Sequence, residues 1–450
     1  ATLLQVSRNT ILNAVDQLIA EDYLEARVGA GIFVTGELPD QVILAETTSG
    51  EATMPQSGEM LLSAQGRQWV GGFRADWYPA NQTSQHLFRN GLPDISRFPF
   101  KVWQKLASKY LLDQPDVIFD FNPDLAGHFP LRAALAQYLG AARAVNCGPE
   151  NVMMLTGVEQ LVYLAAKLLL NPGDKVWVEE PGFPGAARAL QAAGAQIVPV
   201  PVDDKGLDVS YGLATAPDAR LVYVTPSHQF PVGSTLSLER RLQLLNWSAR
   251  SGAWILEDDY DSEYCYDRRP LASLQGLDVN SRVIYMGSFT KVLFPGIRLD
   301  YAVLPPLLVQ PFTTARATLD IHLPTLNQAI LADFIVEGHF SRHIRRMRKH
   351  YGALRRTLLA ALRADEAGLL TPGPSGGGMH ICAWLPADLD DEAVCARAAA
   401  EGIEVLPISR LYVTEAVKPG LVLGYTAAKV AQIPHGVGRL LQVIGALVEQ

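Results

Sequence analysis

Apolar residues near the start of the chain recur at helical spacing and are followed by two short alternating segments. Ser7 is a favourable helix N-cap. The apolar positions after it fall on one side of a helix and leave a polar face: Ile11, Leu12, Val15, Leu18 and Ile19. The segments Leu24–Arg27 and Ile32–Thr35 flank a Val28–Gly31 turn, which predicts a β-hairpin. Residues 1–36 are therefore predicted to form a helix followed by a hairpin.

The rest of the chain divides into a linker and a long alternating region. Residues 37–85 concentrate Gly, Pro, Ser, Thr and Gln with little periodicity, as linkers do, although Met60–Val70 can already begin the next domain. From residue 86 to 450, helix-like and strand-like segments alternate, which predicts an α/β domain. The predicted helices include Leu131–Leu139 and residues 326–362. The predicted strands are Val152–Leu155, Lys175–Val178, Val222–Val224, Ala253–Leu256 and Val283–Met286.

Composition indicates more than one domain and no membrane segment. Of the 450 residues 48% are hydrophobic, and the mean hydropathy is +0.10, so a large core can form. The most apolar segment, Leu161–Leu170, contains Lys167 and is too short to span a bilayer. No signal peptide is visible, and the net charge of −8 does not by itself indicate nucleic acid. The four cysteines lack metal-ligand spacing: Cys147, Cys265, Cys382 and Cys395. We expect a cytoplasmic protein with reduced cysteines, no metal site and no membrane partner.

The segment Ser288–Arg298 combines residues that suit an aldehyde cofactor with a phosphate group. Lys291 has two hydroxyl residues close before it and an arginine seven positions after it. A lysine amine can form a Schiff base with an aldehyde cofactor. Hydroxyl groups and a guanidinium suit phosphate oxygens. Most lysines are solvated surface charges, so the segment alone only suggests this chemistry.

A second candidate element is the acidic run Glu257–Asp261, which follows the predicted strand Ala253–Leu256. Ligands of open α/β sheets bind at the carboxyl ends of strands. Asp258 could keep a pyridine nitrogen protonated there, so that the ring acts as an electron sink, and Tyr260 could reach a ring oxygen. A solvated acidic loop is the alternative. Lys291, which follows another apolar strand, favours the cofactor site.

Four motifs occur together in one known family. They are PGDKVWVEEPGFPG, TPSHQFPVGSTLS, EDDYDSEYCY and SFTKVLFPGIRLDY. With them the chain resembles the MocR/GabR regulators, a branch of the GntR winged-helix regulators, over nearly its whole length and in the family's order. The resemblance implies a fold-type I aminotransferase-like large domain that binds pyridoxal 5′-phosphate (PLP), spanning residues 86–450 with a small C-terminal α+β domain. It also implies a winged helix-turn-helix at residues 1–36, truncated at its N-terminus.

The resemblance assigns a role to each residue of the PLP site. It implies that Lys291 forms the Schiff base, that Asp258 pairs with the pyridine nitrogen and Tyr260 with the ring oxygen, and that Phe183 stacks on the ring. The phosphate ligands that it implies are Ser288, Thr290, Arg298 and a loop at a helix N-terminus made by Gly157, Val158 and Glu159. The family usually has a small or hydroxyl residue and a glutamine where this chain has Val158 and Glu159, and a carboxylate there repels phosphate. His228 is predicted to be a structural donor.

The N-terminal segment VSRNTILNAVDQLIAEDYLEARVGAGIFV resembles the end of a GntR-type winged helix. The helix is then a recognition helix and the hairpin a wing. The predicted DNA contacts are Ser7, Arg8, Asn9 and Thr10, in a first turn that can enter a major groove. Residues 1–36 carry two arginines against four acids, and the family's first helix has no counterpart in the chain. A small helix–hairpin packed on a larger domain therefore stays open as the alternative.

The resemblance implies a homodimeric transcriptional regulator that binds double-stranded DNA and senses PLP, an amino-acid-like effector, or both. The first alternative is a PLP-dependent aminotransferase. Many such enzymes clamp the substrate carboxylate with an arginine where this chain has Val422, and one type of regulator has a ligand-binding arginine where it has Gly185. Arg410 is the remaining candidate. The second alternative is a PLP sensor without an amino-acid ligand.

Overall fold

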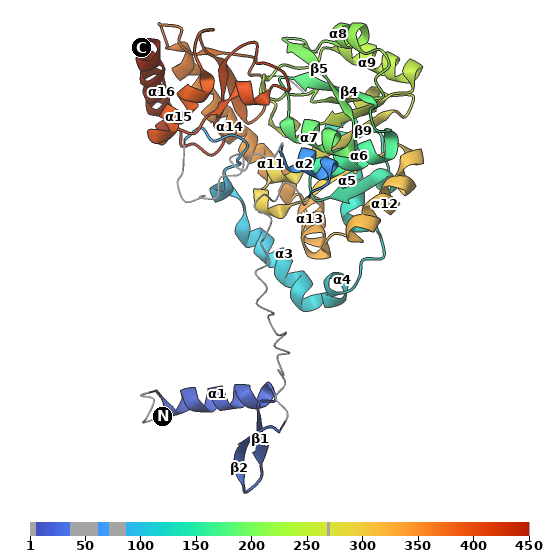
Figure 1. Cartoon of the computed structure of the whole chain (residues 1–450), viewed down its shortest axis with the longest axis vertical. Helices are drawn as coiled ribbons and strands as arrows, with labels where there is room; N and C mark the ends of the chain where they lie inside the picture. The colour runs from blue at the N-terminus through green and yellow to red at the C-terminus, as the bar shows by residue number, and fades with distance from the viewer. Residues whose placement is uncertain (1–5, 37–61, 72–86, 268–270, 450) are drawn as a thin grey trace, which may run out of the picture. The chain divides into compact units, whose positions relative to one another are not determined.

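The structure, a computed structural model, describes residues 6–36, 62–71, 87–267 and 271–449. Its contacts divide the chain into two units, and the boundary in the sequence falls between Ser63 and Ala64 (Figure 1). Among the described residues no helix is long and apolar enough to cross a membrane. All four cysteines are free thiols, as the sequence predicted.

The first unit is the predicted helix and hairpin. Helix α1 (Arg8–Ala20) has Ser7 as its N-cap, whose hydroxyl accepts a hydrogen bond from the Thr10 amide at 3.1 Å. Strands β1 (Leu24–Arg27) and β2 (Gly31–Val34) pair antiparallel, with Leu24 opposite Val34. The N-cap, the helix and the hairpin predicted from the sequence are thus confirmed.

The second unit is organised around a mixed eight-stranded sheet, in which β4, β5, β7, β8 and β9 are parallel neighbours and β10 runs antiparallel to both β9 and β3. Its strands, from one edge to the other, are β3 (Val152–Leu155), β10 (Asp300–Val303), β9 (Val283–Ser288), β8 (Trp254–Asp258), β7 (Leu221–Val224), β4 (Lys175–Glu180), β5 (Gln196–Asp203) and β6 (Gly206–Leu207). All five predicted strands are present. The carboxyl ends of β3, β7, β8 and β9 therefore meet at one edge of the sheet, where ligands of such folds bind.

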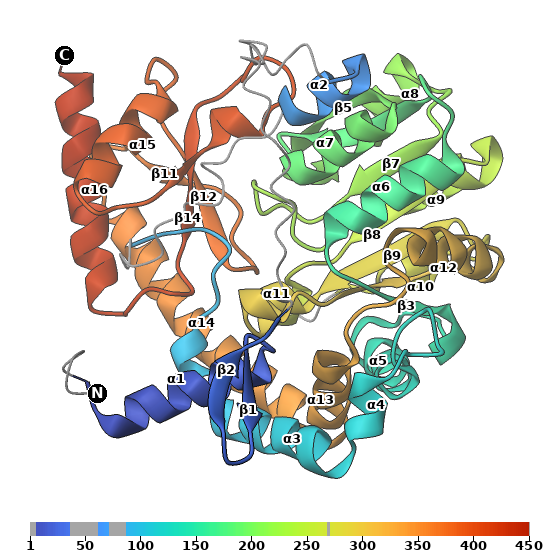
Figure 2. The same ribbon diagram turned by 60° about the horizontal axis from the view of Figure 1, so that its bottom comes forward.

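Helices cover both faces of this sheet because its strands alternate their apolar residues between the faces. On β4, Val176 and Val178 join the core under α6 (Val158–Leu169), α7 (Pro184–Ala193) and α12 (Pro306–Asp320). Trp177, between them, points to the opposite face with α8 (Val209–Thr215) and α9 (Leu238–Ser251) and stacks on Trp247 at 4.1 Å. Figure 2 shows α6 and α7 on the near side of the sheet.

A third core joins a group of helices to a small sheet. The helices are α3 (Phe100–Asp113), α4 (Pro115–Phe119), α5 (Phe129–Arg143), α13 (Thr325–Val336) and α14 (His339–Arg363). The small antiparallel sheet has the order β11 (Thr371–Pro372), β12 (His380–Trp384), β14 (Gly420–Gly424) and β13 (Leu406–Pro407), with α15 (Asp391–Ala400) and α16 (Gln432–Val448) beside it (Figure 2). This is the predicted C-terminal α+β part. The short helices of the unit are α10 (Leu274–Leu277) and α11 (Phe289–Val292).

Helix α2 (Ala64–Gly71) overlaps Met60–Val70, the segment that could already begin the next domain. It lies in the range predicted as a linker, but it belongs to the second unit and contacts α7. Trp69 stacks on Tyr163 of α6, with ring centroids 5.7 Å apart, which ties this segment to the large sheet's helices. The rest of the predicted linker, 37–61 and 72–85, lies outside the described residues.

A buried ion pair fixes the loop that follows β8. Arg143 donates to both carboxylate oxygens of Asp259, at 2.7 and 3.2 Å, and Asp259 also accepts from Ser262 and Tyr285. Burial alone would raise the pKa of Asp259, but the charge of Arg143 and these hydrogen bonds outweigh it and lower that pKa. The ionised pair therefore stabilises the fold above the ordinary aspartate pKa, and this contribution is lost as the pH falls through the lowered value.

We predict that Asp259→Asn lowers the free energy of unfolding at pH 7 by about 3–5 kcal/mol, because it leaves a buried guanidinium without its charge partner. Denaturant unfolding of the variant measures this loss. Asp203→Asn is the matched control, since Asp203 also pairs with an arginine, Arg240, but its side chain is 55% exposed, and its loss should stay below about 1 kcal/mol. Equal losses in the two variants would show that burial of the Arg143 pair does not matter.

Candidate functional site

Lys291 lies in α11, directly after β9, with its amine in a partly buried position. The backbone of Gly91 passes beside it, and a Cβ atom on Gly91 would lie 2.8 Å from Lys291 Nζ. Burial lowers the pKa of Lys291, although the nearby carboxylates of Asp300 and Glu159 act to raise it. A lowered pKa increases the fraction of neutral amine, which is the nucleophilic form.

Asp258 is the last residue of β8 and is almost fully buried. Its Oδ2 accepts a hydrogen bond from the hydroxyl of Tyr223 on β7, whereas its Oδ1 is buried without a partner among the described residues. Burial raises the pKa of Asp258 to about 8, with the Tyr223 hydrogen bond opposing the shift and Asp300 adding to it. A buried carboxylate with one unbonded oxygen suits a protonated ring nitrogen, because such a donor satisfies the oxygen and stabilises its charge.

Tyr260 is held by His228 and Asp261, a connection that the sequence did not indicate. His228 Nδ1 lies 3.0 Å from the Tyr260 hydroxyl and 3.1 Å from Asp261 Oδ2. His228 Nδ1 is thus within hydrogen-bonding distance of both oxygens and links the Asp261 carboxylate to the Tyr260 hydroxyl. The role of His228 as a structural donor stays a prediction.

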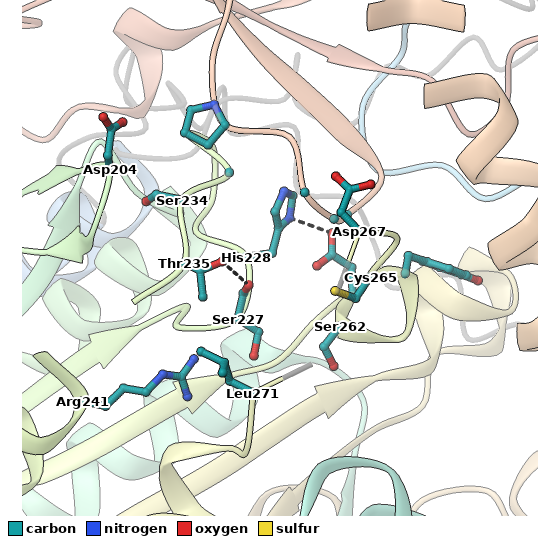
Figure 3. A pocket seen from close by; sticks show the side chains of 17 residues that line it. Asp204, Ser227, His228, Ser234, Thr235, Arg241, Ser262, Cys265, Asp267 and Leu271 are labelled. Atoms are coloured by element: carbon teal, nitrogen blue, oxygen red, sulfur yellow. Dashed lines mark hydrogen bonds and ion pairs between the residues drawn. The ribbon is translucent and has the colours of Figure 1, made fainter. Parts of the chain in front are cut away.

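A cavity of about 360 Å³ has His228 and Asp261 in its lining. Figure 3 shows His228 in the middle of it, with Ser234 and Thr235 on one side and Cys265 and Asp267 on the other. His228, Asp261 and His380 also approach one another closely enough to share a metal ion, with ligand atoms within 4.8 Å. His380 is already anchored by its contact with the carbonyl of Pro231 at 3.0 Å.

Three aromatic rings border the site near β4 and β7. Phe183, the N-cap of α7, meets Phe230 edge-on at 6.2 Å, and Phe230 meets Tyr260 in the same way at 6.4 Å. Gly185 makes room for Phe183, since a Cβ atom there would lie 2.4 Å from Phe183 Cζ. An arginine at this position would displace the Phe183 ring. The predicted stacking residue thus lies at the site, and its stacking on a cofactor stays a prediction.

Four of the six predicted phosphate ligands lie together at the start of α6. Gly157 is the N-cap of this helix, and Val158 and Glu159 are its first two residues. Arg298 reaches the same place, because a Cβ atom on Gly157 would lie 3.2 Å from its guanidinium and 3.3 Å from Glu159 Oε2. Ser288 and Thr290, however, direct their hydroxyls to Asp300, at 2.6 and 3.4 Å. Sequence reasoning missed Asp300, although it follows Arg298 by only two residues.

The candidate positions for a substrate carboxylate carry either no cation or a cation that is already paired. Val422 is fully buried in β14 and packs with Cys382, Ile408 and Leu411. Arg410 is partly buried and donates to Glu392 at 3.0 Å, so its charge is already paired. The arrangement therefore offers a lysine, a carboxylate and a tyrosine for a cofactor, whereas Val422 and Gly185 offer no cation for an amino-acid carboxylate and Arg410 is paired with Glu392.

Comparisons with known proteins define the class of this chain. The family described as aminotransferase class I and II matches residues 96–430. Kynurenine aminotransferase of Pyrococcus horikoshii shares the fold with a TM-score of 0.77 and 26% identity, over 88% of this chain and 98% of that chain. The chain belongs to the aminotransferase class I and II family, a class of PLP-dependent proteins.

Similarity over the full length shows to which group within this family the chain belongs. The probable rhizopine catabolism regulatory protein MocR of Rhizobium meliloti is 37% identical over 444 residues, which cover 99% of this chain and 87% of that protein. The HTH-type transcriptional regulator TauR of Rhodobacter capsulatus is 32% identical over 470 residues, covering 99% and 90%. Within its family the chain is thus a member of the MocR-type regulators, as its four motifs predicted.

Proposed function

We propose that this protein is a transcriptional regulator that binds DNA through residues 1–36 and senses PLP, an amino-acid-like effector, or both in its aminotransferase-like unit. The observation that carries this proposal is the extent of the similarity to MocR, which covers 99% of the chain and so includes helix α1 and its hairpin. An aminotransferase has no need of these elements. A regulator that binds chromosomal DNA would act in the cytoplasm.

The residues of the second unit suit PLP. The unbonded Oδ1 of Asp258 can accept from the pyridinium, Tyr260 can donate to the ring oxygen, and Phe183 can stack on the ring. When bound, PLP supplies an aldehyde that reacts with an amine and a ring that withdraws electrons. Lys291 is the amine that we assign to that aldehyde. Arg298 and the N-terminus of α6, from Gly157 to Glu159, are assigned to the phosphate together with Ser288 and Thr290.

The first turn of α1 suits a major groove. Ser7, Arg8, Asn9 and Thr10 are all exposed, and the Ser7 cap leaves the amides of this turn at a helix N-terminus, where they favour phosphate. Arginine and asparagine are the side chains that most often read guanine and adenine. We further propose that the protein acts as a homodimer, because operators with two half-sites match a two-fold protein, and that effector binding shifts its DNA affinity.

Binding to DNA from upstream of the protein's own gene tests this function. We expect binding that is selective over a shuffled fragment of equal length and that weakens with salt as phosphate contacts are screened. Equal affinity for both fragments at every salt concentration would count against a regulator.

Retained catalysis is the second candidate function, and the geometry around Lys291 and Asp258 favours it. Transamination also requires a hold on the amino-acid carboxylate, and the candidate positions Val422 and Gly185 cannot supply one. We therefore expect no repeated turnover between amino acids and keto acids in the presence of PLP. Many turnovers per protein molecule would establish the aminotransferase instead.

A further inference from the structure

Two carboxylates occupy the subsite assigned to the PLP phosphate. What they imply for PLP binding rests on the proposed function. Glu159 lies in the first turn of α6, and Asp300 is the first residue of β10. Glu159 Oε2 and the Arg298 guanidinium both lie next to Gly157, as the Cβ distances of 3.3 and 3.2 Å show. Asp300 is nine-tenths or more buried, with only 5% of its surface exposed.

The hydroxyls that should serve the phosphate are engaged by Asp300. Ser288 Oγ lies 2.6 Å and Thr290 Oγ1 3.4 Å from Asp300 Oδ1. An ionised carboxylate only accepts hydrogen bonds, so both hydroxyl protons point toward it. A phosphate oxygen entering here meets an acceptor where it needs a donor. Ionised Asp300 and Glu159 also repel the phosphate and offset the attraction of Arg298.

A proton on Asp300 removes both obstacles. The neutral acid has an O–H group that can donate to a phosphate oxygen, and it no longer repels the anion. Burial raises the pKa of Asp300 to about 6, so that a proton is available to it near neutral pH. The charged groups that face Asp300 are Arg298 and Lys291, which lower its pKa, and Glu159, which raises it. Asp258 at the end of β8 also interacts with Asp300 electrostatically.

We propose that the phosphate of PLP enters this subsite together with one proton, which Asp300 takes from solvent and holds as a hydrogen bond to the phosphate. The Glu159 carboxylate adds a repulsion of its own to the same subsite. Together the two carboxylates make PLP an exchangeable ligand of this chain. An exchangeable ligand reports its own free concentration, which is what a sensor requires and a resident cofactor does not provide.

The dissociation constant of PLP, measured by spectroscopic titration between pH 5.5 and 8.5, tests this inference. The wild type is compared with Asp300→Asn, whose side chain stays neutral and keeps an acceptor for Ser288. The titrations of PLP itself, Lys291 and Asp258 affect both proteins, so the ratio of the two dissociation constants isolates Asp300. We expect the dissociation constant of the wild type, divided by that of Asp300→Asn, to be close to one at pH 5.5. It should rise about tenfold for each pH unit above about 6.

Two further variants serve as comparisons for Asp300→Asn. Glu159→Gln should tighten PLP binding by a similar factor at every pH from 6.5 to 8.5, because it removes a charge without removing the proton-binding group. Glu239→Gln removes an exposed carboxylate at the start of α9 and should leave the dissociation constant unchanged. Calorimetry in buffers of different ionisation enthalpy should show that the wild type takes up about one more proton per PLP at pH 7.5 than Asp300→Asn does.

A ratio that stays constant over the whole pH range, while PLP still attaches to Lys291, would overturn the inference and leave the proposed function standing. Absence of PLP binding in the wild type and in both subsite variants at pH 5.5 would instead overturn the PLP assignment, and the inference with it.

Discussion

Replacing Lys291 with alanine is expected to abolish the covalent adduct between this protein and PLP. In the wild type, borohydride should fix PLP to the peptide that contains Lys291, and mass spectrometry should find the modification at that residue. The expected loss in Lys291→Ala is complete, because the reaction needs an amine at the carboxyl end of β9, beside Asp258 and Gly91. Burial also lowers the pKa of Lys291, so a larger fraction of its amine is in the neutral, reactive form.

Lys429→Ala is the control for this prediction. Lys429 is exposed and lies outside the site, so its removal should leave the adduct intact. Non-covalent binding of PLP should survive in Lys291→Ala, because Asp258, Tyr260 and Arg298 remain. An adduct of undiminished amount in Lys291→Ala would move the reactive amine to another residue and remove the basis for the site as assigned.

Replacing Arg8 and Asn9 together with alanine is expected to lower the affinity for the selected upstream DNA by about thirtyfold or more. Each side chain that reads a base contributes about 1–3 kcal/mol of discrimination. Both residues lie in the exposed first turn of α1, and neither is needed for the Ser7 cap. The affinity for shuffled DNA should fall much less, so the selectivity itself should decrease.

Gln17→Ala is the matched control on the same helix. Gln17 lies in its last turns and donates to Glu21 at 2.8 Å, so this variant should bind DNA like the wild type. Circular dichroism should show equal helix content in all three proteins. If the control loses as much affinity as the double variant does, DNA recognition cannot lie in the first turn of α1.

The fold was largely predictable because its signals are local. Alternating and continuous apolar runs marked β3, β4, β7, β8 and β9, and Ser7 marked the start of α1. The position of Asp258 and Lys291 at the ends of neighbouring strands could also be predicted, because consecutive strands of an α/β fold usually lie in one sheet. The stacking of Trp69 of α2 on Tyr163 of α6 could not be predicted, because the two residues are far apart in the sequence.

The parts of the site that could not be predicted depend on contacts between distant segments. His228 comes from the loop after β7, whereas Tyr260 and Asp261 are adjacent in the loop after β8, and only the folded sheet brings His228 to them. Tyr223 meets Asp258 for the same reason. Asp300 was visible two residues after Arg298, but its hydrogen bond with Ser288 requires the antiparallel pairing of β9 and β10. Sequence motifs thus identified the residue types of the site but not the hydrogen bonds between them.

The effect of PLP on DNA binding tests the central claim most directly. Fluorescence anisotropy of labelled upstream DNA should be measured with and without PLP, for the wild type and for Lys291→Ala, at several salt concentrations. The account predicts that PLP changes the DNA affinity of the wild type by about fivefold or more, as expected for coupled sites, and that this change is absent or strongly reduced in Lys291→Ala. Selective DNA binding that is identical with and without PLP would contradict it.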